Sequence, residues 1–358
     1  MNKSIIKKAV LAVLSATCIT AGLSGCGAAG SAEQAPADDR LFVATTLFPY
    51  YDFVRQIAGN RVRLKLVAPA GMDSHSFEPT PADMISLQEA DLLIRNGGAM
   101  EHWTDEALEA LDTGQMKILT MMDYVDVLEE ELVEGMEADE HGHDHEGHEH
   151  EDHDHDHEHI DEEEHEEEHA LHFDEDDGYE MEIEYDEHIW TSPVNAIRIT
   201  EEICNALCEA DPEGSGRYRR NTEAYQAELR QLDAAFRQVT AEGRHRMIVV
   251  ADKVPFRYLA ETYGLSYRAA FSGCSTDTEP GARTIAYLID RVRENDIKAV
   301  YYLELSSHRT AQIIEEETGA APMLLHSCHN VTRREFDEGV TYLQLMKGNV
   351  EALRQGLK

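Results

Sequence analysis

The sequence is poor in basic residues, and this shortage excludes one large class of function. Among 358 residues there are 31 Lys and Arg against 71 Asp and Glu, which gives a formal net charge of −40. Nucleic-acid binding requires clustered Lys and Arg that neutralise phosphates, so we expect no nucleic-acid partner. The shortage is local, because no Lys or Arg occurs between Lys117 and Arg198, whereas residues 129–187 contain 31 Asp and Glu.

Long apolar runs are absent beyond the N-terminus, and the run near the start has the features of an export signal. Three lysines precede an apolar and small-residue run over residues 9–23, which is too short for a comfortable membrane span. No later segment has the roughly 18 apolar residues that a transmembrane helix needs. We therefore expect residues 1–25 to direct export of the chain.

The end of this run indicates a lipid anchor. Residues 23–26 read LSGC, which resembles the lipobox of bacterial lipoproteins, in which the cysteine is acylated and becomes the first mature residue. Residues 26–40 are small and polar, as a flexible tether should be. We expect Cys26 to anchor the protein outside the cytoplasmic membrane. The alternative is an ordinary secretory signal with a chance cysteine.

The remaining cysteines are few and lack a CxxC spacing, which makes a cysteine zinc site less favoured. Cys204 and Cys208 are four residues apart in a helical stretch, a spacing poorly suited to a disulfide between them. Outside the membrane, a disulfide between Cys274 and Cys328 is allowed. Two free buried thiols are the equally supported alternative.

Short β-rich runs alternate with helical periods on both sides of the acidic segment. Such alternation predicts an α/β fold with parallel sheets covered by helices. The expected strands are residues 41–46, 61–67, 91–95, 117–120, 247–251, 266–270, 299–303 and 323–325. The expected helices are residues 50–58, 80–90, 101–111, 193–208, 217–241, 256–263, 282–295, 310–318 and 339–355.

These elements predict two lobes and a helical connection. We expect an N-terminal lobe over residues 41–195, a linking helical segment over 196–244 and a C-terminal lobe over 245–358. The N-terminal lobe contains an insert at about residues 129–180. A long linking helix would act as a rigid spine and limit how far the lobes close. Since ligands bind beyond the carboxyl ends of parallel strands, we expect a site in the cleft between the lobes.

The insert is rich in histidine as well as acid. Residues 141–172 contain 12 of the 19 histidines, among Asp, Glu and Gly. A segment with so few apolar residues cannot bury a core, and imidazoles with carboxylates bind Zn²⁺, Cu²⁺ and Ni²⁺. The accessory metal ligands expected here are His141, His143, His145, His148, His150, His153, His155, His157 and His159. A solvated acidic loop without a metal role is the alternative.

Three further histidines fall in loops where strands end or helices begin. His75 lies in GMDSHSFEP at residues 71–79, and His188 lies in DEHIWTSP at residues 186–193. His326 follows a strand in LLHSCHN at residues 324–330. All three occupy positions that the expected topology brings to the cleft.

Together, these features resemble the zinc/manganese-type solute-binding lipoproteins of bacterial metal ABC importers. The resemblance covers nearly all of residues 41–358 and includes the SHxFEP-type turn, the D-x-H-x-W-x-x-P segment, the acidic insert before it and the lipobox. It implies two (β/α) lobes joined by a long helix, a metal in the cleft and delivery to a membrane permease. We expect a monomer that captures Zn²⁺; a Mn²⁺-binding protein of the same class, or a lipoprotein adhesin, is the alternative.

The resemblance also implies a set of ligands. His75 matches the first metal-binding histidine and His188 the second. Zinc-type relatives have a third histidine before an aromatic-Gly-Tyr-Leu segment, but the matching stretch here, ADKVPFRYL at residues 251–259, contains none. Manganese-type relatives use a Glu in the next loop, which matches Glu279.

The fourth ligand of the manganese-type relatives is an Asp after a late strand, and His326 occupies that position. His329 is the substitute if His326 points away, and a helix-capping role for either is the alternative. Three imidazoles and one carboxylate suit tetrahedral Zn²⁺ better than octahedral Mn²⁺. The expected metal site is therefore His75, His188, Glu279 and His326.

Convincing motifs of hydrolytic enzymes are missing. The sequence contains no GxSxG, and its one HExxH match, HEEEH at residues 165–169, falls within the low-complexity acidic insert. A catalytic zinc site keeps one coordination position open, whereas four protein ligands would close it. We therefore expect a binding protein and not an enzyme.

Overall fold

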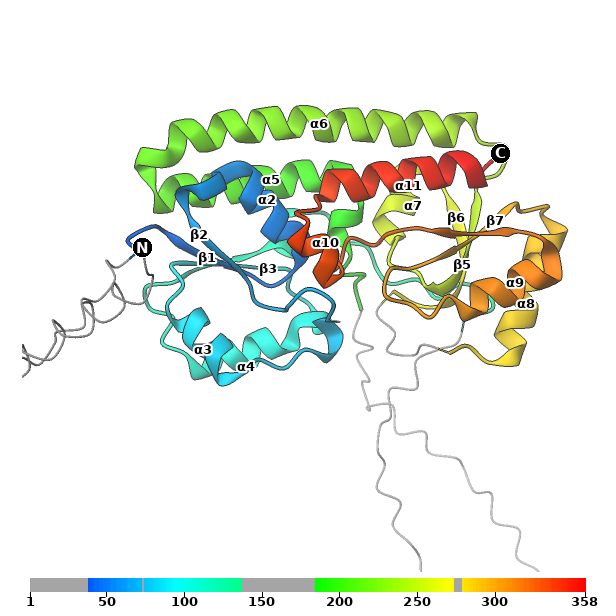
Figure 1. Ribbon diagram of the computed structural model, residues 1–358, viewed down its shortest axis with the longest axis horizontal. Coiled ribbons are helices and arrows are strands. Elements are labelled where there is room, and N and C mark those ends of the chain that lie inside the picture. Colours follow the sequence, from blue (N-terminus) through cyan, green and yellow to red (C-terminus); the bar gives the residue numbers. More distant parts are fainter. Residues whose placement is uncertain (1–37, 73, 137–183, 274–278) are drawn as a thin grey trace, which may run out of the picture. The chain divides into compact units, whose positions relative to one another are not determined.

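Two parallel β-sheets carry the fold (Figure 1). The computed structural model describes residues 38–72, 74–136, 184–273 and 279–358, and Arg40–Lys358 forms one compact unit. The expected signal sequence, the lipid-anchor position Cys26, the histidines of the insert and Cys274 lie outside the described residues. Within the described ranges, none of the helices combines the length and apolar character needed to cross a bilayer.

The N-terminal lobe is built on a four-stranded sheet in the order β2-β1-β3-β4, with every pairing parallel. Its strands are β1 (Phe42–Thr45), β2 (Arg63–Leu66), β3 (Leu92–Arg95) and β4 (Lys117–Thr120). Its helices are α2 (Phe48–Ala58), α3 (Pro81–Gln88) and α4 (His102–Ala110). Because successive strand side chains face opposite ways, Val43 enters the core below α2, whereas Phe42 and Ala44 enter the core that contains Trp103 of α4.

The C-terminal lobe repeats this plan with the order β6-β5-β7-β8, again all parallel. Its strands are β5 (Met247–Lys253), β6 (Ser266–Phe271), β7 (Ala299–Tyr302) and β8 (Ala321–Leu324). Its helices are α7 (Arg257–Tyr263), α8 (Ala282–Glu294), α9 (Arg309–Thr318), α10 (Arg333–Asp337) and α11 (Tyr342–Gly356).

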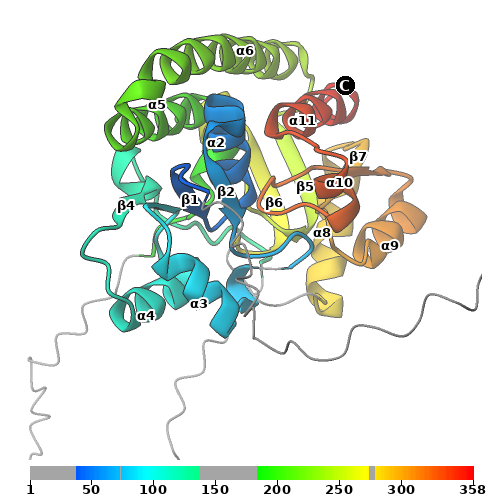
Figure 2. The same ribbon diagram turned by 60° about the vertical axis from the view of Figure 1, so that its left-hand side comes forward.

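Two long helices connect the lobes. They are α5 (Pro193–Ala210) and α6 (Ser215–Glu242), separated by the short 3-10 helix η6 (Pro212–Gly214). Figures 1 and 2 show α6 running along both lobes over α2, α5 and α11. Its buried side, which includes Leu229 and Phe236, belongs to a single core that extends from Val43 in one sheet to Ile248 in the other. A close-packed shared core of this kind resists shear.

The predicted α/β class with two parallel-sheet lobes is confirmed, and the differences are local. Strand β5 continues two residues beyond the predicted end at Ala251. The last helix begins at Tyr342 instead of residue 339, because Thr341 and Gln344 form a reciprocal cap there. Helix α10 and the short 3-10 helices were not predicted, since three to five residues are too few to show a helical period.

Candidate metal site at the ends of the strands

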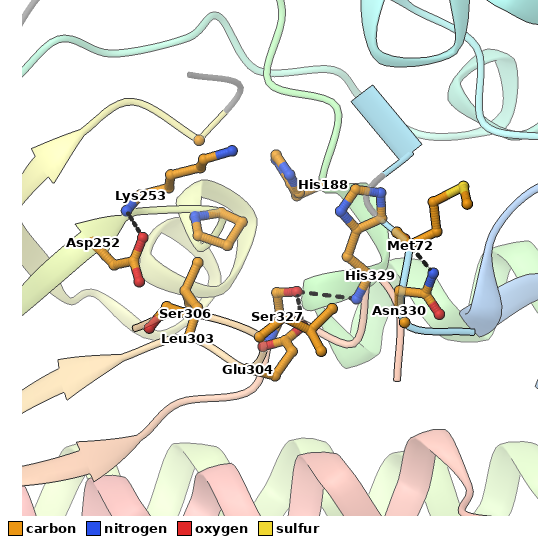
Figure 3. A pocket seen from close by; sticks show the side chains of 14 residues that line it. Met72, His188, Asp252, Lys253, Leu303, Glu304, Ser306, Ser327, His329 and Asn330 are labelled. Carbon is orange, nitrogen blue, oxygen red and sulfur yellow. Dashed lines mark hydrogen bonds between the residues drawn. The ribbon is translucent and has the colours of Figure 1, made fainter. Parts of the chain in front are cut away.

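A pocket of about 300 Å³ lies at the carboxyl ends of the strands of both sheets (Figure 3). Each loop that follows β2, β5, β6, β7 or β8 contributes to its wall. Representative lining residues are Met72, Lys253, Gly273, Glu304 and His329, together with His188. In each sheet the strand order reverses beside the first strand, between β1 and β3 or between β5 and β7. This is the position where parallel sheets bind ligands.

His188 enters the pocket from the segment before α5. The residue is 1% exposed, its backbone N–H donates to Asp186 Oδ1 (2.9 Å), and its Nδ1 lies 3.3 Å from the same oxygen. A carboxylate at Nδ1 favours the tautomer that carries the proton there, so that Nε2 keeps its lone pair for a metal. Gly273 lies so close that a Cβ atom on it would be 3.2 Å from Asp186 Oδ2 and from His188 Nδ1.

Trp190 packs against two histidines of the pocket. It lies in the 3-10 helix η5 (Ile189–Thr191), is fully buried, and donates from Nε1 to the carbonyl oxygen of Ser327 (2.8 Å). Its ring centroid lies 5.4 Å from that of His188 and 5.5 Å from that of His329. The hydroxyl of Tyr342 donates to its carbonyl oxygen (2.7 Å). A rigid aromatic side chain thus fixes the positions of both imidazoles.

His329 faces His188 across the pocket (Figure 3). The two ring centroids are 5.9 Å apart, with the rings almost perpendicular. His329 Nε2 is hydrogen-bonded to the hydroxyl of Ser74 in the N-terminal lobe, and its backbone N–H donates to Ser327 Oγ (3.0 Å). When Nε2 donates its proton to Ser74, Nδ1 carries the lone pair that a metal requires.

His326 lies away from this pocket. Its Nδ1 accepts the backbone N–H of Cys328 (2.9 Å), and its own N–H donates to Asn349 Oδ1 (2.7 Å). Nε2 is buried and has no hydrogen-bond partner among the described residues. Nδ1 faces this N–H and also lies 3.4 Å from Glu304 Oε1, and His326 does not line the pocket.

The backbone at Cys328 explains why two histidines three residues apart differ so much. Cys328 has a φ of 61°, in the left-handed region that non-glycine residues rarely adopt. The chain turns sharply there, so that His326 faces the interior and His329 faces the pocket. The thiol of Cys328 is free and buried, and the Cys274 half of the possible disulfide is outside the described ranges.

The two other predicted ligands are described only in part. The backbone of His75 lies in the 3-10 helix η2 (Ser74–Ser76), next to the serine that contacts His329, but its side chain lies outside the described part. Glu279 is exposed and does not line the pocket. Among the residues with described side chains, no group of three or more His, Cys, Asp or Glu side chains is arranged to hold a metal ion.

Sequence reasoning missed several groups that shape the pocket. Lys253, at the end of β5, extends toward His188 in Figure 3. Glu304 accepts the backbone N–H of Ser327 (2.8 Å) and the hydroxyl of the same residue, so its carboxylate fixes the loop after β8. Asp186 had a recognisable signal, because Asp often accepts the backbone N–H two residues later.

Two buried carboxyl groups lie on the side of the N-terminal lobe. Glu187 accepts the backbone N–H of Met100 (2.9 Å), and Glu101 accepts that of Asn96 (2.8 Å). Burial raises the pKa of each carboxyl group to about 7. The negative charge beside His188 therefore depends on pH near neutrality.

Comparison with known families agrees with this geometry. The sequence model of the family described as "Zinc-uptake complex component A periplasmic" matches residues 43–356. The chain is 31% identical over 338 residues to "High-affinity zinc uptake system protein ZnuA" of Bacillus subtilis (strain 168), an alignment that covers 94% of this chain and 93% of the relative.

A second relative is longer. The chain is 30% identical over 323 residues to "Zinc-binding lipoprotein AdcA" of Streptococcus pneumoniae (strain ATCC BAA-255 / R6), covering 90% of this chain but only 57% of the relative. The fold of the present chain is similar to the crystal structure of the Zn(II)-bound ZnuA-like domain of Streptococcus pneumoniae AdcA, with a TM-score of 0.66 and 26% identity. That match covers 89% of this chain and 99% of that domain.

Proposed function

The chain belongs to the zinc-uptake complex component A family, and on this premise we propose that it captures Zn²⁺ outside the cytoplasmic membrane and delivers it to the permease of an ABC importer. The family is one of solute-binding transport proteins, so the bound ion is the cargo. We propose binding and release as its whole activity, without catalysis.

The observation that carries this proposal is the pair of imidazoles facing each other across the pocket. His188 and His329 come from opposite sides of the cleft, and Asp186 favours the metal-binding tautomer of His188. Neutral imidazole is a preferred zinc ligand, and a carboxylate on its other nitrogen is the usual support. A purely structural role would not require two imidazole side chains that line the same open pocket.

We propose His75, His188 and His329 as the nitrogen ligands. His75 is included because Ser74, its neighbour in η2, contacts the His329 ring. Glu279 remains the sequence-based prediction for the fourth position. It lies six residues after Gly273, where an added Cβ atom would be 3.2 Å from His188 Nδ1. His329 replaces His326 in this proposal because only His329 lines the pocket.

The proposed nitrogen donors favour one of the two candidate metals. Three imidazoles suit Zn²⁺, whereas Mn²⁺ prefers oxygen ligands and six-fold coordination. We propose Zn²⁺ as the cargo of the pocket, Cys26 as the lipid anchor and the histidines of the insert as weaker accessory sites.

Replacing His188 tests the proposal. His188→Ala should weaken zinc binding by at least about 100-fold, because one of a few strong metal bonds is lost. His102→Ala is the matched control, since His102 is an exposed histidine that does not line the pocket. This variant should leave the zinc affinity unchanged. The measurement is competition between metal-free protein and a chromophoric zinc chelator. Wild-type affinity in the His188 variant would refute the proposed site.

A further inference from the structure

The chain segment at the start of the acidic insert pairs with the segment just after its end. We call residues 128–131 and 184–186 the stem. Glu129 and Tyr185 form an antiparallel bridge, the N–H of Glu130 donates to the carbonyl of Glu184 (2.9 Å), and the N–H of Asp186 donates to the carbonyl of Leu128 (2.9 Å). The stem therefore has a defined structure that ends at Asp186, two residues before His188.

The stem and the residues just after its first strand lie on the C-terminal lobe, although they follow β4 of the N-terminal lobe. Tyr267 of β6 donates its hydroxyl to Glu131 (3.1 Å), and Arg257 of α7 lies 3.6 Å from the same carboxylate. Gly135, with a φ of 90°, packs against the ring of Tyr287 on α8, where an added Cβ would lie 2.1 Å from a ring carbon. The described residues at the start of the insert thus contact the lobe opposite to the one from which they come.

Tyr258 of α7 forms hydrogen bonds with both segments of the stem, next to the proposed metal site. Its hydroxyl donates to the carbonyl oxygen of Asp186 (2.7 Å) and accepts the backbone N–H of Leu128 (3.1 Å). The side chain is 3% exposed, and burial raises the pKa of the phenol, so it stays a protonated donor at neutral pH. A single hydroxyl of the C-terminal lobe therefore holds both segments of the stem.

We propose that Tyr258 is a positioning residue of the metal site, which acts through Asp186 on His188. Its hydrogen bond fixes the backbone of Asp186, and the Asp186 carboxylate in turn fixes the orientation and the tautomer of His188. Outer contacts of this type commonly change metal affinity by about 10- to 100-fold. This inference rests on the proposed function.

Tyr258→Phe removes the hydroxyl and keeps the ring. We expect zinc binding to weaken about tenfold and the visible absorption of the Co²⁺-substituted protein to shift, because the geometry around His188 changes. Tyr263→Phe is the matched control: Tyr263 is a second buried tyrosine of α7, and its hydroxyl donates to Asp233 (3.1 Å), outside the stem. It should leave both readouts unchanged.

A double variant shows whether Tyr258 acts through Asp186. Asp186→Asn alone should weaken zinc binding about 10- to 100-fold, and adding Tyr258→Phe should weaken it by less than the product of the two single effects. The inference would be overturned if the double variant lost zinc affinity by the full product of the two single effects. It would also be overturned by an unchanged Co²⁺ spectrum in Tyr258→Phe, or by equal losses of zinc affinity in the Tyr258 and Tyr263 variants. These outcomes require a wild-type protein that binds zinc tightly, and its failure to do so would overturn the proposed function instead.

Discussion

Identical substitutions at two neighbouring histidines separate the geometry of the pocket from the sequence-based assignment. We expect His329→Asn to abolish tight zinc binding and His326→Asn to preserve it. His329 lines the pocket opposite His188, whereas His326 is buried outside it with Nδ1 engaged by the N–H of Cys328. Asparagine suits position 326, because its Oδ1 can replace Nδ1 as the acceptor of the Cys328 N–H, and the same substitution at 329 makes the two variants comparable.

The expected magnitudes follow from the contacts of each ring. Protein zinc sites have apparent binding free energies of about 10–16 kcal/mol, or about 3 kcal/mol for each of four ligands. Loss of His329 should therefore weaken binding by at least about 100-fold, since 1.4 kcal/mol corresponds to a factor of ten. At position 326, the variant removes a buried Nε2 that has no hydrogen-bond partner among the described residues. Removal of this unpartnered polar atom should raise the free energy of unfolding by about 1–3 kcal/mol, which offsets the cost of the lost packing volume.

Competition titration of both variants with a chromophoric chelator measures the affinities, and thermal unfolding of the metal-free proteins checks their folds. His326→Asn should bind zinc within about threefold of the wild type, a change of less than 0.7 kcal/mol or so. Loss of tight binding in a folded His326 variant, with retention in the His329 variant, would show that the pocket argument is wrong.

Two other predictions concern the buried carboxyl group of Glu101 and the acidic insert. Burial raises the pKa of Glu101 from an ordinary value of 4.5 to about 7, so its contribution to stability is present below about pH 4.5 and is lost as the pH rises through about 7. Calorimetry of metal-free Glu101→Gln should therefore show a smaller fall in melting temperature from about pH 5 to 8 than the wild type, and an equal fall would contradict this. Deletion of residues 141–172 should remove weak zinc sites and leave the tight one, because the segment has no apolar face to pack; loss of the tight site on titration would show that the insert supplies a ligand.

The elements of the fold were predictable because their signals are local. Strands such as β3 and β7 are short apolar runs between turn residues, and α8 has an apolar stripe with a helical period. The order of strands within each sheet needs contacts between distant segments, such as Val43 with Leu92. No local pattern specifies those contacts, so the order had to come from the structure.

The site was predictable to the level of the loops and not of the side chains. The sequence placed His188 and His326 at the ends of elements, and the structure places both loops beside the pocket. The choice between His326 and His329 depends on the left-handed backbone at Cys328, which non-glycine residues seldom adopt. The hydrogen bond from Tyr258 to Asp186 joins residues 72 positions apart and left no trace in the local sequence.

The shared core limits the ways in which the protein can take up and release its ion. Rotating one lobe against the other would disturb side chains such as Phe236 and Tyr342, which are fully buried in one core that both lobes share. The contacts across the pocket are much weaker: Ser74 with His329, and Asn330 with the carbonyl of Pro69 (3.0 Å). Each such hydrogen bond contributes only about 1 kcal/mol, whereas burial of one large apolar side chain contributes about 2–3 kcal/mol. Ion exchange through movement of these loops is therefore less costly than hinge motion, and it leaves the His188 side of the pocket in place.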